Sequence, residues 1–285
     1  MTSITGAHRR LEAGTPAREL ARLAVAQVDL ANRVLGCASR SPYADEVRSA
    51  LSEAAGFAAW VHADMQDTGS ARFYYRRAID SARQADNALL AAYMIGSLAA
   101  FEIDADDPLT GLNLLARARR EIGERPPATA RAWLLSIEAL GHAAARDEAA
   151  ALQALRAAES AVRAVAPPWP WVFPFDHAKP AGYRALVMVR LKRPAEAVAA
   201  FNESLSSAQP GAKQRGVLMT EVATVEAMSG RYDEALYLAS NALTVGTAYG
   251  SERVLHRVRT FRRAYGGPPS NALRSFDERL HATLL

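Results

Sequence analysis

The architecture of this chain is indicated by one stretch, Gly230-Arg231-Tyr232-Asp233-Glu234-Ala235-Leu236-Tyr237-Leu238-Ala239-Ser240-Asn241-Ala242-Leu243. Gly230 is predicted to end one helix, because glycine adopts the left-handed turn conformation without a steric penalty. Asp233 and Glu234 then fall in the first turn of the next helix, whose positive end favours carboxylates. Ala235 and Ala242 lie seven residues apart on one face and let a neighbouring helix approach closely. The stretch therefore predicts the turn and second helix of a helical hairpin.

The same pattern recurs along the chain at nearly constant spacing. Small anchor residues stand at Ala71, Gly111, Ala151, Ala197 and Ala235, so successive anchors are 40, 40, 46 and 38 residues apart. Twelve residues before each anchor stands an alanine: Ala59, Ala99, Ala139, Ala185 and Ala223. Because the first helix of a hairpin needs a small residue where the second helix crosses it, these columns predict five consecutive hairpins.

The whole chain is predicted to be all-α. Half of its 285 residues are hydrophobic, good helix formers dominate, and no segment alternates apolar and polar residues as a strand does. Since a single hairpin cannot bury its apolar face, stacking is expected to produce a right-handed superhelix of about five hairpins with a period of about 40 residues.

This superhelix is predicted to cover residues 51–250, with helical caps at both ends. Residues 1–15 are expected to be flexible and residues 16–50 to form N-terminal capping helices. Residues 251–285 are expected to form a basic helix and a closing helix. The aromatic segment 166–176 contains four prolines, which exclude a helix and account for the 46-residue spacing. This segment either covers a joint between hairpins or presents its aromatic side chains to a ligand.

The composition excludes several classes of protein. The net charge of +4 is too small by itself to indicate nucleic-acid binding, which needs basic residues concentrated on one face. The single cysteine, Cys37, excludes an internal disulfide. No apolar run approaches the roughly 18 residues of a membrane span, and no signal peptide is recognisable. A cytoplasmic location is therefore expected.

No catalytic, metal-binding or cofactor-binding pattern is found. His62 and His142 share one repeat column, which indicates a structural origin for both. The acidic run 102–107 lacks the glycine and the distal glutamate of a calcium loop. The chain has no phosphate-binding glycine loop and no nucleophile elbow. We therefore expect neither an enzyme nor a bound cofactor.

A concave groove lined by the first helices of the hairpins is the predicted binding site. Counting from the alanine column gives candidate ligand-binding residues Glu53, Trp60, Asp64, Tyr93, Trp133, Lys179 and Arg190. The same counting gives further exposed positions at Gly96, Asp104, Ser136, Leu140, Gly182, Thr220 and Thr224. Aromatic residues and arginine are frequent binding anchors, so a peptide could lie along this surface. Alternatively, Trp60 and Trp133 pack against the preceding helix.

A second candidate site is a basic patch near the C-terminus. It contains Arg253, Arg257, Arg259, Arg262 and Arg263, with Glu252 as almost the only counter-charge in the sequence nearby. The patch is either a solvated face, favoured at the C-terminal half of a helix, or a site for an acidic partner or nucleic acid. Little aromatic interleaving accompanies it, which weakens a single-strand-binding interpretation.

The repeat pattern resembles the tetratricopeptide repeat. Over roughly residues 17–284, the chain also resembles the tetratricopeptide-like C-terminal region of actinomycete transcriptional regulators. The segments that carry this resemblance are 90–93, 171–176, 182–184, 193–197 and the basic tail 253–263. Those regulators usually have a helix-turn-helix domain before this region, and the residues preceding the first repeat here are too few for one. The resemblance therefore implies the sensing or partner-binding half of such a regulator.

Three functions are consistent with the sequence. The first is a regulatory module that binds a peptide, a small signal or a protein partner in the groove. The second is a constitutive scaffold without a signal ligand, and the third is direct nucleic-acid binding through the C-terminal arginines. The apolar closing helix could also form a homodimer.

Overall fold

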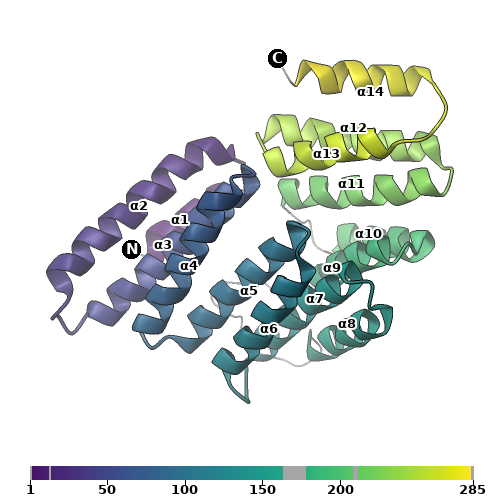
Figure 1. Cartoon of the computed structure of the whole chain (residues 1–285). Coiled ribbons are helices and arrows are strands. Elements are labelled where there is room, and N and C mark those ends of the chain that lie inside the picture. Colours follow the sequence, from purple (N-terminus) through teal and green to yellow (C-terminus); the bar gives the residue numbers. More distant parts are fainter. Residues whose placement is uncertain (1, 13, 163–177, 208–210, 284–285) are drawn as a thin grey trace. The chain divides into compact units, whose positions relative to one another are not determined.

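The computed structural model describes residues 2–12, 14–162, 178–207 and 211–283. Helices and short turns make up this part of the chain, and no strand occurs in it (Figure 1). The chain divides into two compact units, Met1–Asp176 (unit 1) and His177–Leu285 (unit 2). The prediction of an all-α chain is therefore confirmed for the described residues.

Unit 1 contains eight described helices, most of them arranged as antiparallel pairs. The helices are α1 (Thr2–Glu12), α2 (Ala17–Ala38), α3 (Ala44–Asp64), α4 (Thr68–Gln84), α5 (Ala88–Asp104), α6 (Pro108–Ile122), α7 (Ala128–Ala144) and α8 (Glu148–Val162). The most extensive packing occurs within the pairs α3/α4, α5/α6 and α7/α8. Each pair also contacts the next through α4 with α5 and α6 with α7.

The described residues of unit 2 form two further pairs and two closing helices. Its helices are α9 (Ala178–Arg190), α10 (Pro194–Ser207), α11 (Ala212–Met228), α12 (Tyr232–Ala248), α13 (Glu252–Ala264) and α14 (Asn271–Ala282). Helices α9/α10 and α11/α12 form the pairs, α13 packs on α11 and α12, and α14 packs on α12. The predicted closing helix is present, with Phe276 and Leu280 buried.

The turn inside each of these five pairs has the same backbone geometry. One residue has a positive φ in every turn: Gln66 (61°), Asp106 (66°), Arg146 (64°), Lys192 (57°) and Gly230 (78°). The amide of the following residue donates a hydrogen bond, 2.9–3.0 Å long, to the carbonyl five residues earlier. These turn residues are 40, 40, 46 and 38 residues apart, which matches the spacing of the small anchors in the sequence.

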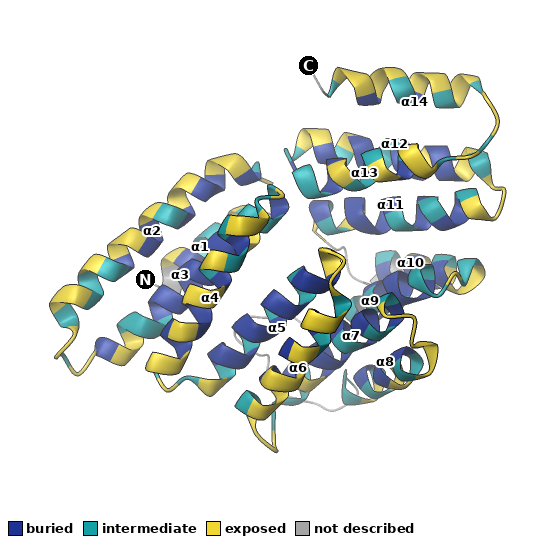
Figure 2. Ribbon diagram, viewed as in Figure 1, coloured by how far each residue is buried: buried dark blue, intermediate teal, exposed yellow. Residues whose placement is uncertain are grey.

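The predicted small-residue columns lie in the core. All five alanines of the first-helix column have no exposed surface, and the anchors Ala71, Ala151, Ala197 and Ala235 are equally inaccessible. In Figure 2, buried residues run along the paired helices, and they make up most of α3, α7 and α11. The small side chains therefore stand where helices cross, as close packing of two helices requires.

Residues 2–12, which belong to the segment expected to be flexible, form the helix α1. An isolated helix of 11 residues is marginal in water, so its stability depends on packing. Thr5 supplies part of this packing, because its side chain is buried and accepts a 2.7 Å hydrogen bond from Gln27 Nε2 of α2. The predicted aromatic segment 166–176 lies outside the described residues.

Among the described helices, none combines the length and the apolar character needed to cross a lipid bilayer.

Candidate binding surface

The first helices of the pairs form one continuous layer in unit 1. Helix α3 contacts α5, and α5 contacts α7, whereas the second helices reach the next pair mainly through its first helix. Glu53, Tyr93 and Trp133 stand at the same repeat position on these three helices, six residues before the alanine column. We call the side of α3, α5 and α7 that carries these three residues the first-helix face.

This face carries aromatic side chains. The rings of Tyr93 and Trp133 lie 5.3 Å apart at an interplanar angle of 32°. Trp60, near the end of α3, keeps 41% of its surface exposed, which is unusual for tryptophan. An aromatic pair with a further exposed tryptophan offers the kind of anchor that binding sites use most often.

Helix α1 covers part of the first-helix face. The ring of His8 lies 5.8 Å from the ring of Phe57 of α3, measured between centroids. The guanidinium carbon of Arg9 lies 5.6 Å from the ring centroid of Tyr93 of α5, within the range of a cation–π interaction. His8 and Arg9 were not predicted as site residues, because no spacing within residues 1–15 shows which other helices these two side chains meet.

Several predicted groove residues are less exposed than expected. Glu53 and Asp64 retain 6% and 5% of their surface, and Trp133 retains 9%. Helix α3 is contacted by four helices, α1, α2, α4 and α5, and every residue from 50 to 59 is buried. One free side was expected on each first helix, and α3 has less free surface than that.

The column three residues before the alanines was also assigned wrongly to the groove. Gly96, Ser136, Gly182 and Thr220 are buried, and so is Leu140. A methyl group added at Gly96 would lie 2.6 Å from the Trp133 indole, because the next first helix packs directly on this position. At Gly96 this column is therefore a second close-packing seam, between the first helices α5 and α7, and not a solvent-facing row. Asp104 is exposed and Thr224 is half-buried.

In unit 2, the predicted groove residues Lys179 and Arg190 are half-buried on α9. Arg190 Nη1 is buried and has no hydrogen-bond partner in the described part of the chain.

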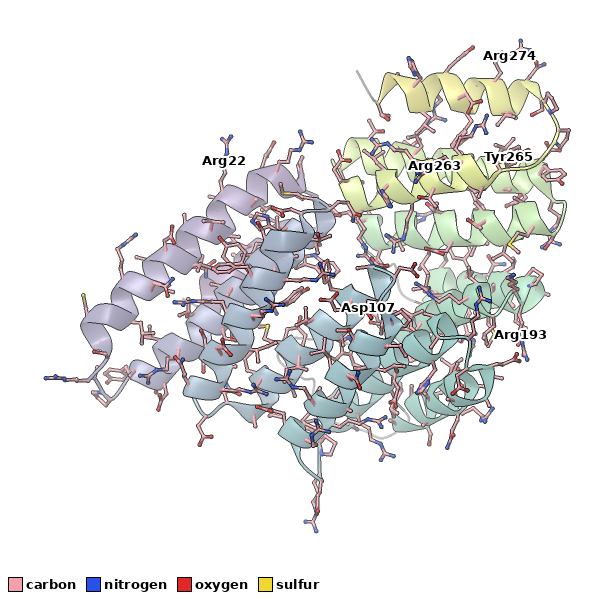
Figure 3. All side chains as sticks on the ribbon, in the orientation of Figure 1. Arg22, Asp107, Arg193, Arg263, Tyr265 and Arg274 are labelled. Atoms are coloured by element: carbon pink, nitrogen blue, oxygen red, sulfur yellow. The ribbon has the colours of Figure 1, made fainter. Side chains whose placement is uncertain are left out.

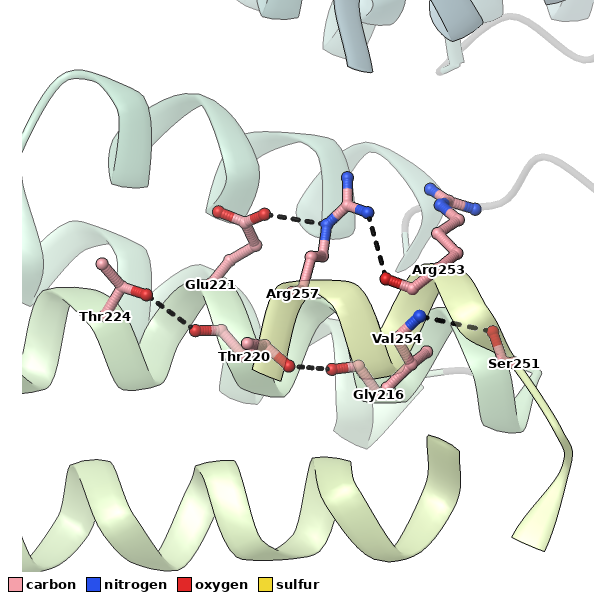
Figure 4. A network of polar contacts seen from close by, with 8 residues as sticks. All are labelled: Gly216, Thr220, Glu221, Thr224, Ser251, Arg253, Val254 and Arg257. Carbon is pink, nitrogen blue, oxygen red and sulfur yellow. Dashed lines mark hydrogen bonds and ion pairs between the residues drawn. The ribbon is translucent and has the colours of Figure 1, made fainter. Parts of the chain in front are cut away.

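The C-terminal arginines are paired with carboxylates to a greater extent than the sequence indicated. Arg257 Nε donates to Glu221 of α11 at 3.1 Å, and Arg257 Nη1 reaches the carbonyl of Arg253 at 3.5 Å (Figure 4). Arg259 pairs with Glu252 at 3.3 Å.

The same holds nearer the end of α13. Arg262 binds Asp277 of α14 through two hydrogen bonds, which raises the pKa of this arginine further. Arg263 remains exposed and donates to Thr260 at 3.0 Å (Figure 3). Glu221 and Asp277 are thus counter-charges that the sequence analysis missed, because they come from other helices. They make the patch a poorer candidate for an acidic partner.

The repeat column that holds His62 and His142 is structural in its contacts. His62 Nδ1 lies 3.1 Å from Asp67 Oδ2, and the His62 ring stacks on Tyr74 with 5.4 Å between centroids. In the same column, Glu102 receives both Arg72 Nε at 2.9 Å and Arg72 Nη2 at 2.7 Å, which joins α4 to α5. Among the described residues, no group of three or more histidine, cysteine or acidic side chains is placed to bind a metal ion.

A shallow depression on α4 was not expected from the sequence. Gly69, Arg72, Phe73, Arg76, Arg77 and Asp80 line it. All six residues come from one helix, so no second element contributes groups that converge on a ligand. We therefore consider the first-helix face the stronger candidate surface.

Comparison with family models, with curated proteins and with solved structures gives no match for this chain.

Proposed function

We propose that this chain is a non-enzymatic tetratricopeptide-type protein that binds a peptide or helical segment of a partner protein on the first-helix face of unit 1. In this proposal the five helix pairs belong to a right-handed superhelix, and the role is regulatory. The resemblance to the C-terminal region of actinomycete regulators supports a place in transcriptional or biosynthetic regulation.

The observation that carries the proposal is the set of aromatic side chains on the first-helix face. Trp60, Tyr93 and Trp133 occupy three successive first helices, and none is required by the turn geometry or by the alanine column. Tryptophan and tyrosine supply large contact areas with few rotatable bonds, which is why they recur as anchors in protein interfaces. Stacked helix pairs present such anchors along an extended surface.

Site-specific photo-crosslinking in the native cell tests this proposal. A photoreactive amino acid placed at Trp60 should give a discrete crosslinked species with one partner, and Tyr93→Ala in the same chain should reduce its yield. The matched control position is Leu109 on α6, which is 68% exposed but lies on a second helix. Equal crosslinking from both positions, or none from Trp60, would contradict the assignment of this face.

Thermal melting then separates a sensing module from a permanent scaffold. A signal that binds only the folded chain raises its melting temperature with concentration. A partner that remains bound through purification, without any such response to cell metabolites or peptides, favours the scaffold.

A further inference from the structure

Helix α1 is held on the first-helix face by few buried contacts. Among its described side chains only Thr5 is buried, while the two large aliphatic ones, Ile4 and Leu11, are 43% and 52% exposed. His8 Nδ1 is buried and has no hydrogen-bond partner in the part of the chain that the structure describes. A buried polar atom without a partner weakens the contact that buries it. The packing of α1 is therefore marginal compared with that of the paired helices.

The chain is also interrupted after α1. Gly14 is exposed, and Pro16 precedes α2 with an extended backbone, φ −55° and ψ 138°. A helix cannot continue through these residues, so α1 is connected to α2 by a short segment and not by a rigid extension. Since an isolated helix of this length is marginal, α1 is helical because the face supports it.

The contacts beneath α1 have the chemistry of a recognition site. Thr5 and Arg9 are one helical turn apart, and they meet Gln27 of α2 and Tyr93 of α5. The ring of Tyr93 in turn lies 5.3 Å from that of Trp133, at a tilt of 32°, so the cation of Arg9 lies at one end of an aromatic pair. Binding of a helix through residues spaced by four is a general mode of peptide recognition.

We propose that α1 is a built-in occupant of a helix-binding site, and that a partner helix with the same two features displaces it. The partner helix carries arginine or lysine one turn after a small hydroxyl residue, as Arg9 follows Thr5. Its cation takes the place of Arg9 over Tyr93. This inference rests on the proposed function and adds to it the chemistry of the partner and a mechanism of autoinhibition.

The short connection between α1 and α2 determines how strongly α1 competes with a partner helix. A segment linked by a few residues competes at an effective concentration of about 1 mM, so a free helix of equal intrinsic affinity binds poorly while α1 is seated. Loosening α1 should then increase partner affinity without changing any residue of the site.

Two substitutions of Gly6 in the full-length chain test this. Gly6→Pro breaks α1 in its middle, because proline removes a helical hydrogen bond and clashes with the preceding turn. Gly6→Ala is the matched control: its new methyl group would meet only Arg10 Nη1 at 3.7 Å, and alanine favours the helix. The probe is a fluorescently labelled peptide of residues 2–14, measured by anisotropy.

The expected order of affinity is Gly6→Pro, then wild type, then Gly6→Ala, with at least a tenfold difference between the two variants. Arg9→Glu in the full-length chain should also bind the probe more tightly than wild type does, which covers the case in which Gly6→Pro perturbs the fold. Adding Tyr93→Ala to Gly6→Pro, or Arg9→Ala to the probe, should weaken binding at least tenfold.

Equal probe binding by the Gly6→Pro and Gly6→Ala chains, or probe binding that is unchanged by Tyr93→Ala, overturns this inference. The proposed function fails separately, when photo-crosslinking from Trp60 gives no partner. A chain that crosslinks a partner equally well in both Gly6 variants would retain the proposed function and exclude autoinhibition by α1.

Discussion

The hairpin turns of unit 1 and unit 2 share one backbone geometry but stabilise it with different side chains. In unit 1 the residue after the positive-φ position is an aspartate in all three pairs, and each aspartate accepts a 3.1 Å hydrogen bond from an amide of the next helix. In unit 2 the same position is Arg193 or Arg231 (Asp107 and Arg193 are labelled in Figure 3). An arginine has no acceptor, so it cannot cap a helix N-terminus in this way.

The side chain five residues before this position, on the other side of the turn, also differs between the units. His62 and His142 lie 3.1 Å and 3.9 Å from Asp67 and Asp147, respectively. In unit 2 the corresponding pair is Glu226 with Arg231, so the carboxylate and the base have exchanged places. Three of the five turns thus pair a carboxylate with a basic side chain, whereas Glu102 with Asp107 and Met188 with Arg193 occupy the same two positions without such a pair. The backbone conformation of the turn is the same in both units, whereas the side chain that caps the following helix differs.

The largest effect is expected from Arg231→Ala in unit 2. Glu226 is almost fully buried, and removing its cation leaves a buried carboxylate without its ion-pair partner. Because Arg231 is itself half exposed, we expect a loss of about 2 kcal/mol, below the usual cost of breaking a fully buried pair. Chemical denaturation measures this. Glu226→Gln with Arg231→Ala should recover part of the loss, and no recovery would show that packing, not charge, is responsible.

The second seam offers a comparison at one repeat position. Gly96→Ala in unit 1 forces a methyl group to within 2.6 Å of Trp133 and 2.8 Å of Leu134, whereas the methyl group of Gly182→Ala in unit 2 lies 3.2 Å from Ser204 Oγ and 3.9 Å from Leu218. We expect Gly96→Ala to cost about 1–2 kcal/mol by overpacking. Gly182→Ala should be close to neutral. Gly36→Ala, which meets nothing within 4 Å in α2, is the control for helix propensity alone. Equal melting temperatures for the Gly96 and Gly182 variants would contradict the seam.

The aspartate cap can be removed in unit 1 without changing the turn. Asp147→Ala should destabilise the chain by about 1 kcal/mol, because the Ala150 amide loses its acceptor. Asp147→Asn keeps an acceptor and should be nearly neutral. Hydrogen exchange of the first turn of α8 reports the effect locally. Faster exchange in the Asn variant as well would assign the effect to the loss of charge near His142.

The positive-φ residues provide a test of the shared backbone. Arg146 adopts φ 64° with a side chain that disfavours it, and Gly230 adopts φ 78° without that cost. Arg146→Gly should therefore stabilise unit 1 by about 0.5–1 kcal/mol, and Gly230→Ala should destabilise unit 2 by a similar amount. Both shifts can be measured by thermal melting. Two shifts of the same sign would show that the two turns differ.

Acid should weaken the caps of unit 1. Hydrogen bonds from Ser70 lower the pKa of Asp67, and hydrogen bonds from Thr110 lower the pKa of Asp107. A lowered pKa means that this stabilisation is complete above the ordinary value of about 4 and is lost as the pH falls through the lowered one. Between about pH 6 and pH 3, the melting temperature of the double variant Asp67→Asn/Asp107→Asn should therefore fall less than that of wild type. Equal decreases in melting temperature for the two proteins would exclude these caps as the source of the acid sensitivity.

The sequence predicted the elements that depend on local spacing. The alanine column and the anchors such as Ala71 gave the register of all five pairs, because each pair repeats the same crossing and the same turn. The closing helix was predicted from the spacing of Leu273, Phe276 and Leu280, and in the structure Ser270 caps it by accepting from the Leu273 amide at 3.0 Å.

The features that were missed depend on contacts between distant segments. The position of α1 follows from what Thr5 and Arg9 meet on α2 and α5, and no pattern within residues 1–15 shows this. The pairing of Arg257 with Glu221 joins residues 36 positions apart. The burial at Gly96 could have been inferred, since Gly56, Gly96, Ser136 and Gly182 form a second column of small residues at a constant offset from the alanines.

The repeated turn also has a consequence for how such a chain can change its length. Removing residues 107–146 would join Asp106 directly to Asp147 and so rebuild a left-handed residue followed by an aspartate cap. A gene encoding this protein could therefore lose or duplicate a 40-residue segment at these junctions with little damage to the chain path on either side. Evolution could then change the number of hairpins, and with it the length of the protein, without requiring a new type of turn between helices.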